Sequence, residues 1–344
     1  MTDNSNTVDD AKARDTWFDK VPKVELHLHL EGAIPHNALW ELIQKYGGEP
    51  SVPNLQALVE KFKYRDFLHF METWVWKNQF LREYEDFTFI SEAVARDLAD
   101  QNVLYAETFF APSDFARHGL GTQKLAEAIR AGLSKVPEVE IALVADLVRS
   151  RKLEDASSTL AEINEVRELG VIGITIGGSE QAHPPGRFAD IYERARQLGF
   201  HTSAHAGEAA GPESIWGAIH SLKVERIGHG TRAFEDDSLV DYIASHKIPL
   251  EVCLISNVRT CVVESIAKHP ICNYFDRGII VTINTDDPKM FNTSLAEEYR
   301  ALEGELGFSR EEVRGIILQG VEASWLSEDR KIELVKSFRE HPDW

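Results

Sequence analysis

The fold of this chain can be read from the segment Val24-Glu25-Leu26-His27-Leu28-His29-Leu30-Glu31-Gly32. Apolar and polar residues alternate strictly along it, which is the period of a β-strand, because successive side chains point to opposite faces. One face is aliphatic, and the other carries His27 and His29. Two histidines two positions apart lie roughly 6.6 Å apart along a strand, close enough to bind one cation. A purely structural pair of histidines is the alternative.

Short apolar runs alternate with helical patterns over the rest of the chain. The opening segment and seven later runs are predicted as strands; the later runs are Val103–Phe110, Val139–Leu147, Val171–Ile176, His201–His205, Arg226–His229, Leu250–Leu254 and Ile279–Asn284. Helices are expected between them at Gln123–Leu133, Leu153–Leu169, Gly186–Leu198, Pro212–Leu222, Asp237–Ser245 and His269–Arg277. Eight strand–helix units predict an α/β fold, a (β/α)8 TIM barrel, with an open doubly wound sheet as the alternative.

Two further helical regions are expected outside these repeating units. Residues 35–100, after the first strand, read as a long helical insertion rich in aromatic residues. Its rings either pack into the core or cover an apolar pocket, in which case the insertion would serve as a lid. The chain from Ser294 onward reads as extra C-terminal helices, with Leu295, Tyr299 and Leu302 spaced to face the barrel. Residues 21–344 are interpreted as one domain, preceded by a polar, flexible segment at 1–20.

The composition excludes several classes of function. A net charge of -19 and a pI near 5.1 would repel nucleic acid and anionic membranes, but a free nucleoside or base remains possible as a partner. The 3 cysteines form no C-x-x-C pair, which favours a reducing compartment. Neither a signal peptide nor a long apolar run is recognisable, so a cytoplasmic protein is expected. The sequence does not predict the oligomeric state.

Unusual polar residues fall at the ends of several predicted strands. His205 ends the fifth strand, His229 ends the sixth, and Asp286-Asp287 follow the eighth. In a barrel the carboxyl ends of all strands share one face, so these residues are expected to meet His27 and His29. The set His27, His29, His205 and Asp286 suits one Zn²⁺, whose bound water would have a pKa near about 7. Taken singly, His205 could be structural and Asp286 could cap a helix.

Three other positions are candidates for contact with a substrate. Glu208, just beyond His205, is a candidate proton donor or acceptor, or alternatively a carboxylate that favours a helix N-terminus. His229 has glycine neighbours and could hold or deprotonate the attacking water, or be a buried structural histidine. The loop Gly177-Gly178-Ser179-Glu180 offers backbone N–H groups to a neutral heterocycle, or is a plain tight turn.

The combined pattern resembles the adenosine deaminase family of the metal-dependent amidohydrolase superfamily. The resemblance rests on four motifs in the family's order, which are His27-Leu28-His29-Leu30-Glu31-Gly32-Ala33, His205-Ala206-Gly207-Glu208, Arg226-Ile227-Gly228-His229-Gly230 and Asn284-Thr285-Asp286-Asp287-Pro288. It implies hydrolytic removal of the 6-amino group of an adenine ring, which leaves a 6-oxopurine and ammonia. It also implies that His27, His29, His205 and Asp286 bind one zinc per chain.

The resemblance assigns further roles to single residues. It implies that Glu208 protonates ring N1 as hydroxide adds to C6, and that His229 orients and helps to activate the hydroxide. It also implies that Asp287 hydrogen-bonds at N7 and that a backbone N–H of Gly178 reaches N3. A bridging lysine, found at the fourth strand in many two-metal relatives, is replaced here by glycine, which favours one metal.

Departures from the family pattern bear on the substrate. Typical adenosine deaminases have aspartate at the position of Glu31, where it contacts the ribose 5′-hydroxyl. The resemblance also implies that Glu31 and His29 are substrate-binding residues in this chain. The glutamate resembles relatives that act on adenine or on modified nucleosides such as aminodeoxyfutalosine. We expect an adenine nucleoside, with adenine itself or another superfamily hydrolysis as alternatives. A catalytically silent nucleoside-binding protein is a hypothesis of a different class.

Overall fold

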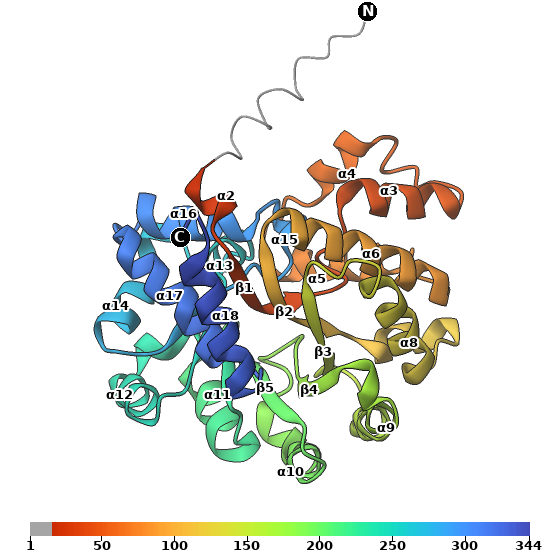
Figure 1. Ribbon diagram of the computed structural model, residues 1–344. Coiled ribbons are helices and arrows are strands. Elements are labelled where there is room, and N and C mark those ends of the chain that lie inside the picture. Colours follow the sequence, from red (N-terminus) through yellow and green to blue (C-terminus); the bar gives the residue numbers. More distant parts are fainter. Residues whose placement is uncertain (1–15) are drawn as a thin grey trace, which may run out of the picture.

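Eight parallel β-strands surround the centre of the molecule, and each pairs with the next strand along the chain (Figure 1). This computed structural model describes residues 16–344. The strands are β1 (Lys23–His29), β2 (Val103–Phe110), β3 (Glu140–Asp146), β4 (Val171–Thr175), β5 (His201–Ala206), β6 (Arg226–His229), β7 (Leu250–Val252) and β8 (Val281–Ile283). The circle closes where Leu28 forms a parallel bridge with Asp286, just after β8. The predicted (β/α)8 barrel is confirmed.

Strand β1 is buried along its whole length. Its aliphatic face packs against the outer helices, since a Cβ added at Gly320 would lie only 2.7 Å from a methyl group of Val24. Its other face points into the barrel, where His27 meets Glu251 of β7 at 2.7 Å. The alternation in the sequence therefore reflects helices on one side and the barrel interior on the other.

The last two strands are shorter than predicted. Strand β7 ends at Val252, and Leu254 already begins helix α13 (Leu254–Arg259). Strand β8 covers only Val281–Ile283 of the predicted Ile279–Asn284. An apolar run does not distinguish a buried strand from the first turn of a buried helix, which explains the difference at Leu254.

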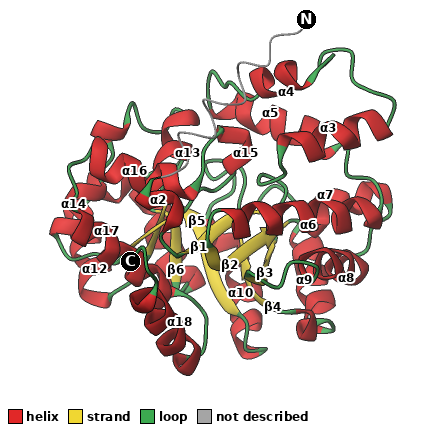
Figure 2. Ribbon diagram, turned by 45° about the horizontal axis from the view of Figure 1, so that its top comes forward, coloured by secondary structure: helices red, strands yellow, loops and turns green. Residues whose placement is uncertain are grey.

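Helices surround the barrel (Figure 2). Those that follow strands β2 to β7 are α7 (Pro112–Phe115), α8 (Thr122–Leu133), α9 (Leu153–Asn164), α10 (Ala189–Gln197), α11 (Pro212–Gly217), α12 (Asp237–His246), α13 and α14 (Ile271–Asp276). The predicted helix Leu153–Leu169 ends early, at Asn164, and a 3₁₀ turn follows at Arg167–Leu169. The predicted Pro212–Leu222 continues beyond α11 as a π-helical turn, Ala218–Leu222.

The insertion between β1 and β2 is not one long helix. It consists of α3 (His36–Lys45), α4 (Leu55–Lys61), α5 (Phe67–Asn78) and α6 (Tyr84–Asp100). Gly47 and Gly48 follow the end of α3. Their φ angles of 93° and 82° lie in the left-handed region that favours glycine. Asn54 and Asp66 then cap α4 and α5 by accepting from backbone N–H groups. These turn and capping residues are the physical reason for four separate helices.

Four helices beyond β8 complete the fold. They are α15 (Pro288–Phe291), α16 (Leu295–Gly304), α17 (Arg310–Ala323) and α18 (Glu328–Glu340). Leu295, Tyr299 and Leu302 are buried as predicted. Helix α17 packs on β8 and β1, so the chain end covers the place where the barrel closes.

The N-terminal segment predicted at residues 1–20 lies mostly outside the described residues. Its last part forms a short helix, α2 (Trp17–Lys20). The indole Nε1 of Trp17 donates to the carbonyl of Asp343 at 2.6 Å, which joins the two ends of the described chain. Among residues 16–344, no helix has both the length and the apolar character needed to cross a membrane.

Candidate active site

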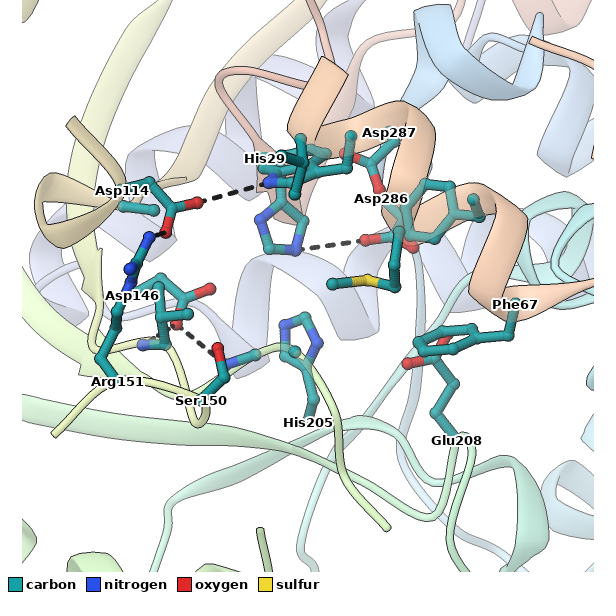
Figure 3. Close-up of a pocket in the computed structure, with 18 of the residues that line it drawn as sticks. His29, Phe67, Asp114, Asp146, Ser150, Arg151, His205, Glu208, Asp286 and Asp287 are labelled. Carbon is teal, nitrogen blue, oxygen red and sulfur yellow. Dashed lines mark hydrogen bonds and ion pairs between the residues drawn. The ribbon is translucent and has the colours of Figure 1, made fainter. Parts of the chain in front are cut away.

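A pocket opens at the carboxyl ends of the strands. Figure 3 shows His29, His205 and Asp286 directed toward it, with Asp114 and Arg151 at its left-hand side. Residues from both ends of the chain line it, namely His29, Phe67, Phe70, Met71, Trp74, Val75, Ala111, Asp114, Asp146, Val148, Ser150, Arg151, Gly177, Gly178, His205, Glu208, His229, Asp286 and Asp287.

The four predicted metal ligands lie together. Nε2 of His27 and Nε2 of His29 each lie 3.4 Å from Oδ1 of Asp286. His27, His29 and His205 each offer a nitrogen, and these three atoms lie within 4.8 Å of one another. Nε2 of His27 and Nε2 of His205 are buried and have no hydrogen-bond partner among the described residues. A buried polar atom without a partner is costly, and a cation bound here would satisfy these nitrogens.

The backbone around these residues is bent sharply. Asp286 and His229 both have φ angles of 63°, in the left-handed region that side chains other than glycine rarely adopt. The N–H of Asp286 donates to the carbonyl of His27 at 3.0 Å, and the N–H of His29 donates to the carbonyl of Asp286 at 2.9 Å. Barrel closure therefore fixes the position of Asp286, and unfavourable backbone angles of this kind cluster at functional sites.

His27 is supported from inside the barrel by residues that the sequence did not single out. Its Nδ1 donates to Oε2 of Glu251, and Arg226 donates to the other carboxylate oxygen of Glu251 at 2.7 Å. Although burial opposes the shift, the neighbouring carboxylates of Asp286 and Glu251 raise the pKa of His27 to about 10. Glu251 leaves Nε2 of His27 as the atom available on the pocket side.

Asp286 is oriented by a residue from α13. The hydroxyl of Ser256 donates to Oδ2 of Asp286 at 2.7 Å, which leaves Oδ1 facing the histidines. Burial works against ionisation, but the neighbouring His27 holds the pKa of Asp286 well below its usual range. The side chain is thus an anionic oxygen ligand.

Glu208 stands at the edge of the cluster, with Oε2 3.6 Å from Nε2 of His229. Burial, the charge of Asp286 and the charge of Glu180 raise the pKa of Glu208 well above its ordinary value. The carboxylate of Glu180 accepts from the backbone N–H groups of Gly207, Glu208, Ala209 and Ala210, which holds the loop after β5. The raised pKa favours the protonated carboxyl group of Glu208, which this loop holds at a fixed position.

His229 ends β6 and is almost fully buried. Burial lowers the pKa of His229 to about 3 and that of His29 to about 4. Nε2 of His229 has no hydrogen-bond partner among the residues that the structure describes. An uncharged imidazole nitrogen is therefore directed at the site.

Asp287 lies deep in the pocket. Burial and the charge of Asp286 raise the pKa of Asp287 well above its ordinary value. A Cβ at Gly32 would lie 1.7 Å from Oδ1 of Asp287, so only glycine fits at that position. This close approach explains the glycine that follows Glu31 in the opening motif.

Gly178 lines the pocket in the loop after β4, with a φ of 95°. The N–H of Gly177 donates to Oδ1 of Asp146 at 2.9 Å, and the N–H of Val148 donates to the same atom at 2.8 Å. Burial raises the pKa of Asp146 to about 6. Asp146 was not predicted as a site residue. Its position near the end of the predicted strand Val139–Leu147 could have indicated it, because the other candidate residues also lie at strand ends.

Glu31 is not among the residues that line the pocket. Strand β1 ends at His29, and Glu31 lies in the turn that follows, where the N–H of Gly32 donates to the carbonyl of His29. Oε1 of Glu31 accepts from the backbone N–H of Ala111 at 3.1 Å. Burial raises the pKa of Glu31 to about 7. The structure thus brings together every other predicted site residue but leaves Glu31 behind the pocket wall.

Helix α5 supplies an apolar wall to the pocket through Phe67, Phe70, Met71, Trp74 and Val75. The other aromatic residues of the insertion pack elsewhere, for example Phe80, which contacts Trp76 edge to face. Some rings of the insertion therefore line the pocket, and others pack into the core. Opposite this wall, Arg151 pairs with Asp114 at 2.8 Å, and neither residue was singled out from the sequence.

The family model described as adenosine deaminase matches residues 22–341. The chain belongs to the adenosine deaminase family. The expected resemblance is thereby confirmed, including membership of the amidohydrolase superfamily.

Relatives within the family differ in substrate. The chain is 33% identical to an adenine deaminase of Pseudomonas syringae pv. tomato over 311 residues, 89% of this chain and 98% of that protein. It is 35% identical to an aminodeoxyfutalosine deaminase of Streptomyces avermitilis over 312 residues, 89% of this chain and 87% of that protein. The chain is an enzyme of purine metabolism that acts on an adenine C–N bond.

A solved structure in the same superfamily contains a metal. An amidohydrolase from Burkholderia ambifaria with bound zinc has a TM-score of 0.86 and 25% sequence identity, and the alignment covers 94% of this chain and 91% of that chain. The family is metal-dependent, and the cluster of histidines and Asp286 fits such a cation.

Proposed function

We propose that this enzyme is a zinc-dependent hydrolase that removes the 6-amino group of an adenine nucleoside. Water and the nucleoside give the 6-oxopurine and ammonia. The observation that carries this proposal is the position of Glu208, a carboxyl group with a raised pKa, beside a cluster of three histidines and one ionised aspartate.

One Zn²⁺ per chain would be held by His27, His29, His205 and Asp286. Two observations support this set: the unpartnered Nε2 atoms of His27 and His205, and the nitrogen and oxygen chemistry that zinc prefers. The ion would supply Lewis acidity that makes water a nucleophile near neutral pH.

Glu208 serves as the proton donor to ring N1. Protonation at N1 withdraws electrons from C6, the carbon that water attacks. Glu208 then receives a proton from the attacking water and passes it to the leaving amino group. As the C6–N bond breaks, the remaining hydroxyl proton returns to Glu208, which leaves the 6-oxopurine, ammonia and a protonated carboxyl group. Its raised pKa favours the protonated form that begins this sequence of steps.

Asp287 and Gly178 orient the purine. Asp287 donates a hydrogen bond to N7 from its carboxyl group, whose raised pKa favours the protonated form. The backbone N–H of Gly178 donates to N3 from the opposite side of the pocket. The apolar side chains of α5, among them Phe70 and Trp74, cover the face of the ring. Hydrogen bonds at defined ring nitrogens select an adenine ring over rings that lack them.

The sugar is expected between α5 and the polar wall that contains Ser150 and the Asp114–Arg151 pair. These groups can donate to and accept from hydroxyl groups, which favours a nucleoside over a free base. His29 lines the pocket and is expected to contact the sugar as well. Glu31 stays a predicted substrate contact, although it does not line the pocket in this structure.

Adenine is the second candidate substrate, since the Pseudomonas syringae relative is an adenine deaminase. Steady-state kinetics with adenine, adenosine and 5′-substituted adenosines, aminodeoxyfutalosine among them, separate the candidates. We expect the adenine absorbance band to decay with a nucleoside in a zinc-containing sample. Absence of any change with all of these compounds would contradict the proposed function.

A further inference from the structure

His229 contacts Asn257 of α13 on the side of its ring away from Glu208. Nδ1 of His229 lies 3.2 Å from the side-chain nitrogen Nδ2 of Asn257. Nε2 of the same ring points toward Glu208 and has no hydrogen-bond partner among the described residues. The position of the ring proton therefore depends on which way the amide of Asn257 is turned.

A chain of hydrogen bonds that begins at a backbone group fixes this amide. The N–H of Ile271 can only donate, and its acceptor, at 3.2 Å, is Nδ1 of His269. His269 is buried, and burial lowers its pKa to about 3, so the ring is neutral and its single proton lies on Nε2. Nε2 of His269 lies 3.2 Å from Oδ1 of Asn257 and donates to it.

A second donor supports the same orientation. The hydroxyl of Thr231 donates to Oδ1 of Asn257 at 3.0 Å. With its oxygen facing His269 and Thr231, the amide of Asn257 must present its NH₂ group to His229. Nδ1 of His229 is thus an acceptor and carries no proton, so the single proton of the ring lies on Nε2.

We infer that Asn257 is a positioning residue that holds His229 as the Nε2–H tautomer, so that His229 donates a hydrogen bond to the attacking oxygen and does not take its proton. The catalytic part of this inference rests on the proposed function. Proton transfer is left to Glu208, whose carboxyl group lies 3.6 Å from Nε2 of His229. A fixed donor aimed at an oxygen on which charge develops lowers the barrier without needing to reorient.

The hydrogen-bond partners of the clustered histidines also distinguish a metal ligand from a residue that is not one. The carboxylate of Glu251 can only accept, so Nδ1 of His27 keeps its proton, and a cation would take the place of any proton on Nε2. Asn257 imposes the opposite tautomer on His229, which leaves no lone pair on Nε2. His229 is therefore excluded as a ligand, although its nitrogen lies within the cluster.

Nitrogen NMR of protein labelled in its histidines tests this assignment, with and without added zinc. The signals of His229 are identified by their loss in His229→Gln. We expect a protonated Nε2 and an unprotonated Nδ1 in the wild-type protein. In Asn257→Asp, which has nearly the same shape but no N–H to donate, we expect Nδ1 of His229 to take up a proton.

Kinetics give a second readout. Asn257→Asp is expected to lower kcat by about 100-fold, the cost of disturbing one donor to a developing charge, with a smaller change in KM. Thr231→Val is the matched control, because it removes a donor to Oδ1 of Asn257 but leaves the bond from His269. It is expected to retain the wild-type tautomer and most of the wild-type kcat.

A protonated Nδ1 with an unprotonated Nε2 in wild-type His229 would overturn the inference. An unprotonated Nδ1 in Asn257→Asp would overturn it as well. If the wild-type spectrum is as expected but no adenine compound is deaminated, the proposed function fails and the assignment of His229 and Asn257 stands.

Discussion

Glu251 accepts a hydrogen bond from Nδ1 of His27 at 2.7 Å, while Nε2 of the same ring faces Asp286. Glu251→Gln replaces a charged acceptor with an amide and loosens the ring. We expect affinity for zinc to fall roughly 10- to 100-fold, the usual effect of removing such a partner. Zinc retained after dialysis against a graded chelator measures this change.

Glu225→Gln is the control for this prediction. Glu225 accepts from Nδ1 of His201 at 2.8 Å, which is the same kind of contact. The two side chains are 43% and 42% exposed, and neither lines the pocket. Zinc affinity is expected to remain at the wild-type value. Equal zinc retention by Glu251→Gln and the wild type would show that His27 needs no such support.

Glu208→Gln is expected to keep its zinc and to lose turnover. The amide cannot exchange a proton with N1, with the attacking water or with the leaving group, so kcat should fall about 10²- to 10⁴-fold. Parallel measurement of zinc content and steady-state kinetics checks both parts. Turnover near the wild-type rate would remove Glu208 from the proposed reaction.

Asp286→Ala is expected to lose metal as well as activity. It removes the one carboxylate whose oxygen lies 3.4 Å from both His27 and His29. Elemental analysis of the purified variant, beside Glu208→Gln, separates loss of metal from loss of proton transfer. Unchanged zinc in Asp286→Ala would exclude this residue from the ligand set.

Gly32→Ala tests the packing of Asp287. The new methyl group would lie 1.7 Å from Oδ1 of Asp287 and must displace that side chain. We expect KM for a nucleoside to rise by about tenfold or more, since a lost or misplaced hydrogen bond costs about 1.5 kcal/mol. Gly315→Ala, in α17 and with open space at its Cβ, should leave the kinetics unchanged and raise stability by roughly 1 kcal/mol. Equal kinetics in both variants would contradict the assigned contact.

Asp86 gives a pH-dependent contribution to stability. Although burial opposes the shift, hydrogen bonds from Lys45, Tyr46 and two backbone N–H groups at the start of α6 hold the pKa of Asp86 below its ordinary value of 3.8. The contribution is fully present above pH 3.8 and is lost as the pH falls through the lower, folded-state pKa.

Asp86→Asn should therefore lower the free energy of unfolding by about 2 kcal/mol at pH 7, the value of a hydrogen bond to a charged group. The difference from the wild type should shrink as the pH falls below 3.8. Urea unfolding of both proteins across this range measures it. A difference that stays constant with pH would contradict the role of the ionised carboxylate.

The strands and the metal-ligand candidates were predictable because they depend on local pattern. Apolar runs located all eight strands, and the rule that carboxyl ends share one face brought His205 and Asp286 to His27. The strand predicted from the alternating pattern was too long, since β1 ends at His29. Glu31 lies in the turn that follows, where its carboxylate accepts from the N–H of Ala111.

The residues that support the site were not predictable from local pattern. Glu251 lies within an apolar run, and its role depends on His27 across the barrel. Asn257 acquires its role from Ile271 through His269, both in a later segment. Such partners are set by the closed fold, and no spacing in the sequence encodes them.

The closure of the barrel through Leu28 and Asp286 has a consequence for the order of events in the cell. A ribosome synthesises His27 early and Asp286 late, so a growing chain cannot offer the four proposed ligands until most of it has been made. Metal uptake by the whole set must then follow synthesis of β8. A bound cation stabilises only a chain that has joined its first and last strands. The metal would therefore stabilise the complete protein and not a partly synthesised chain.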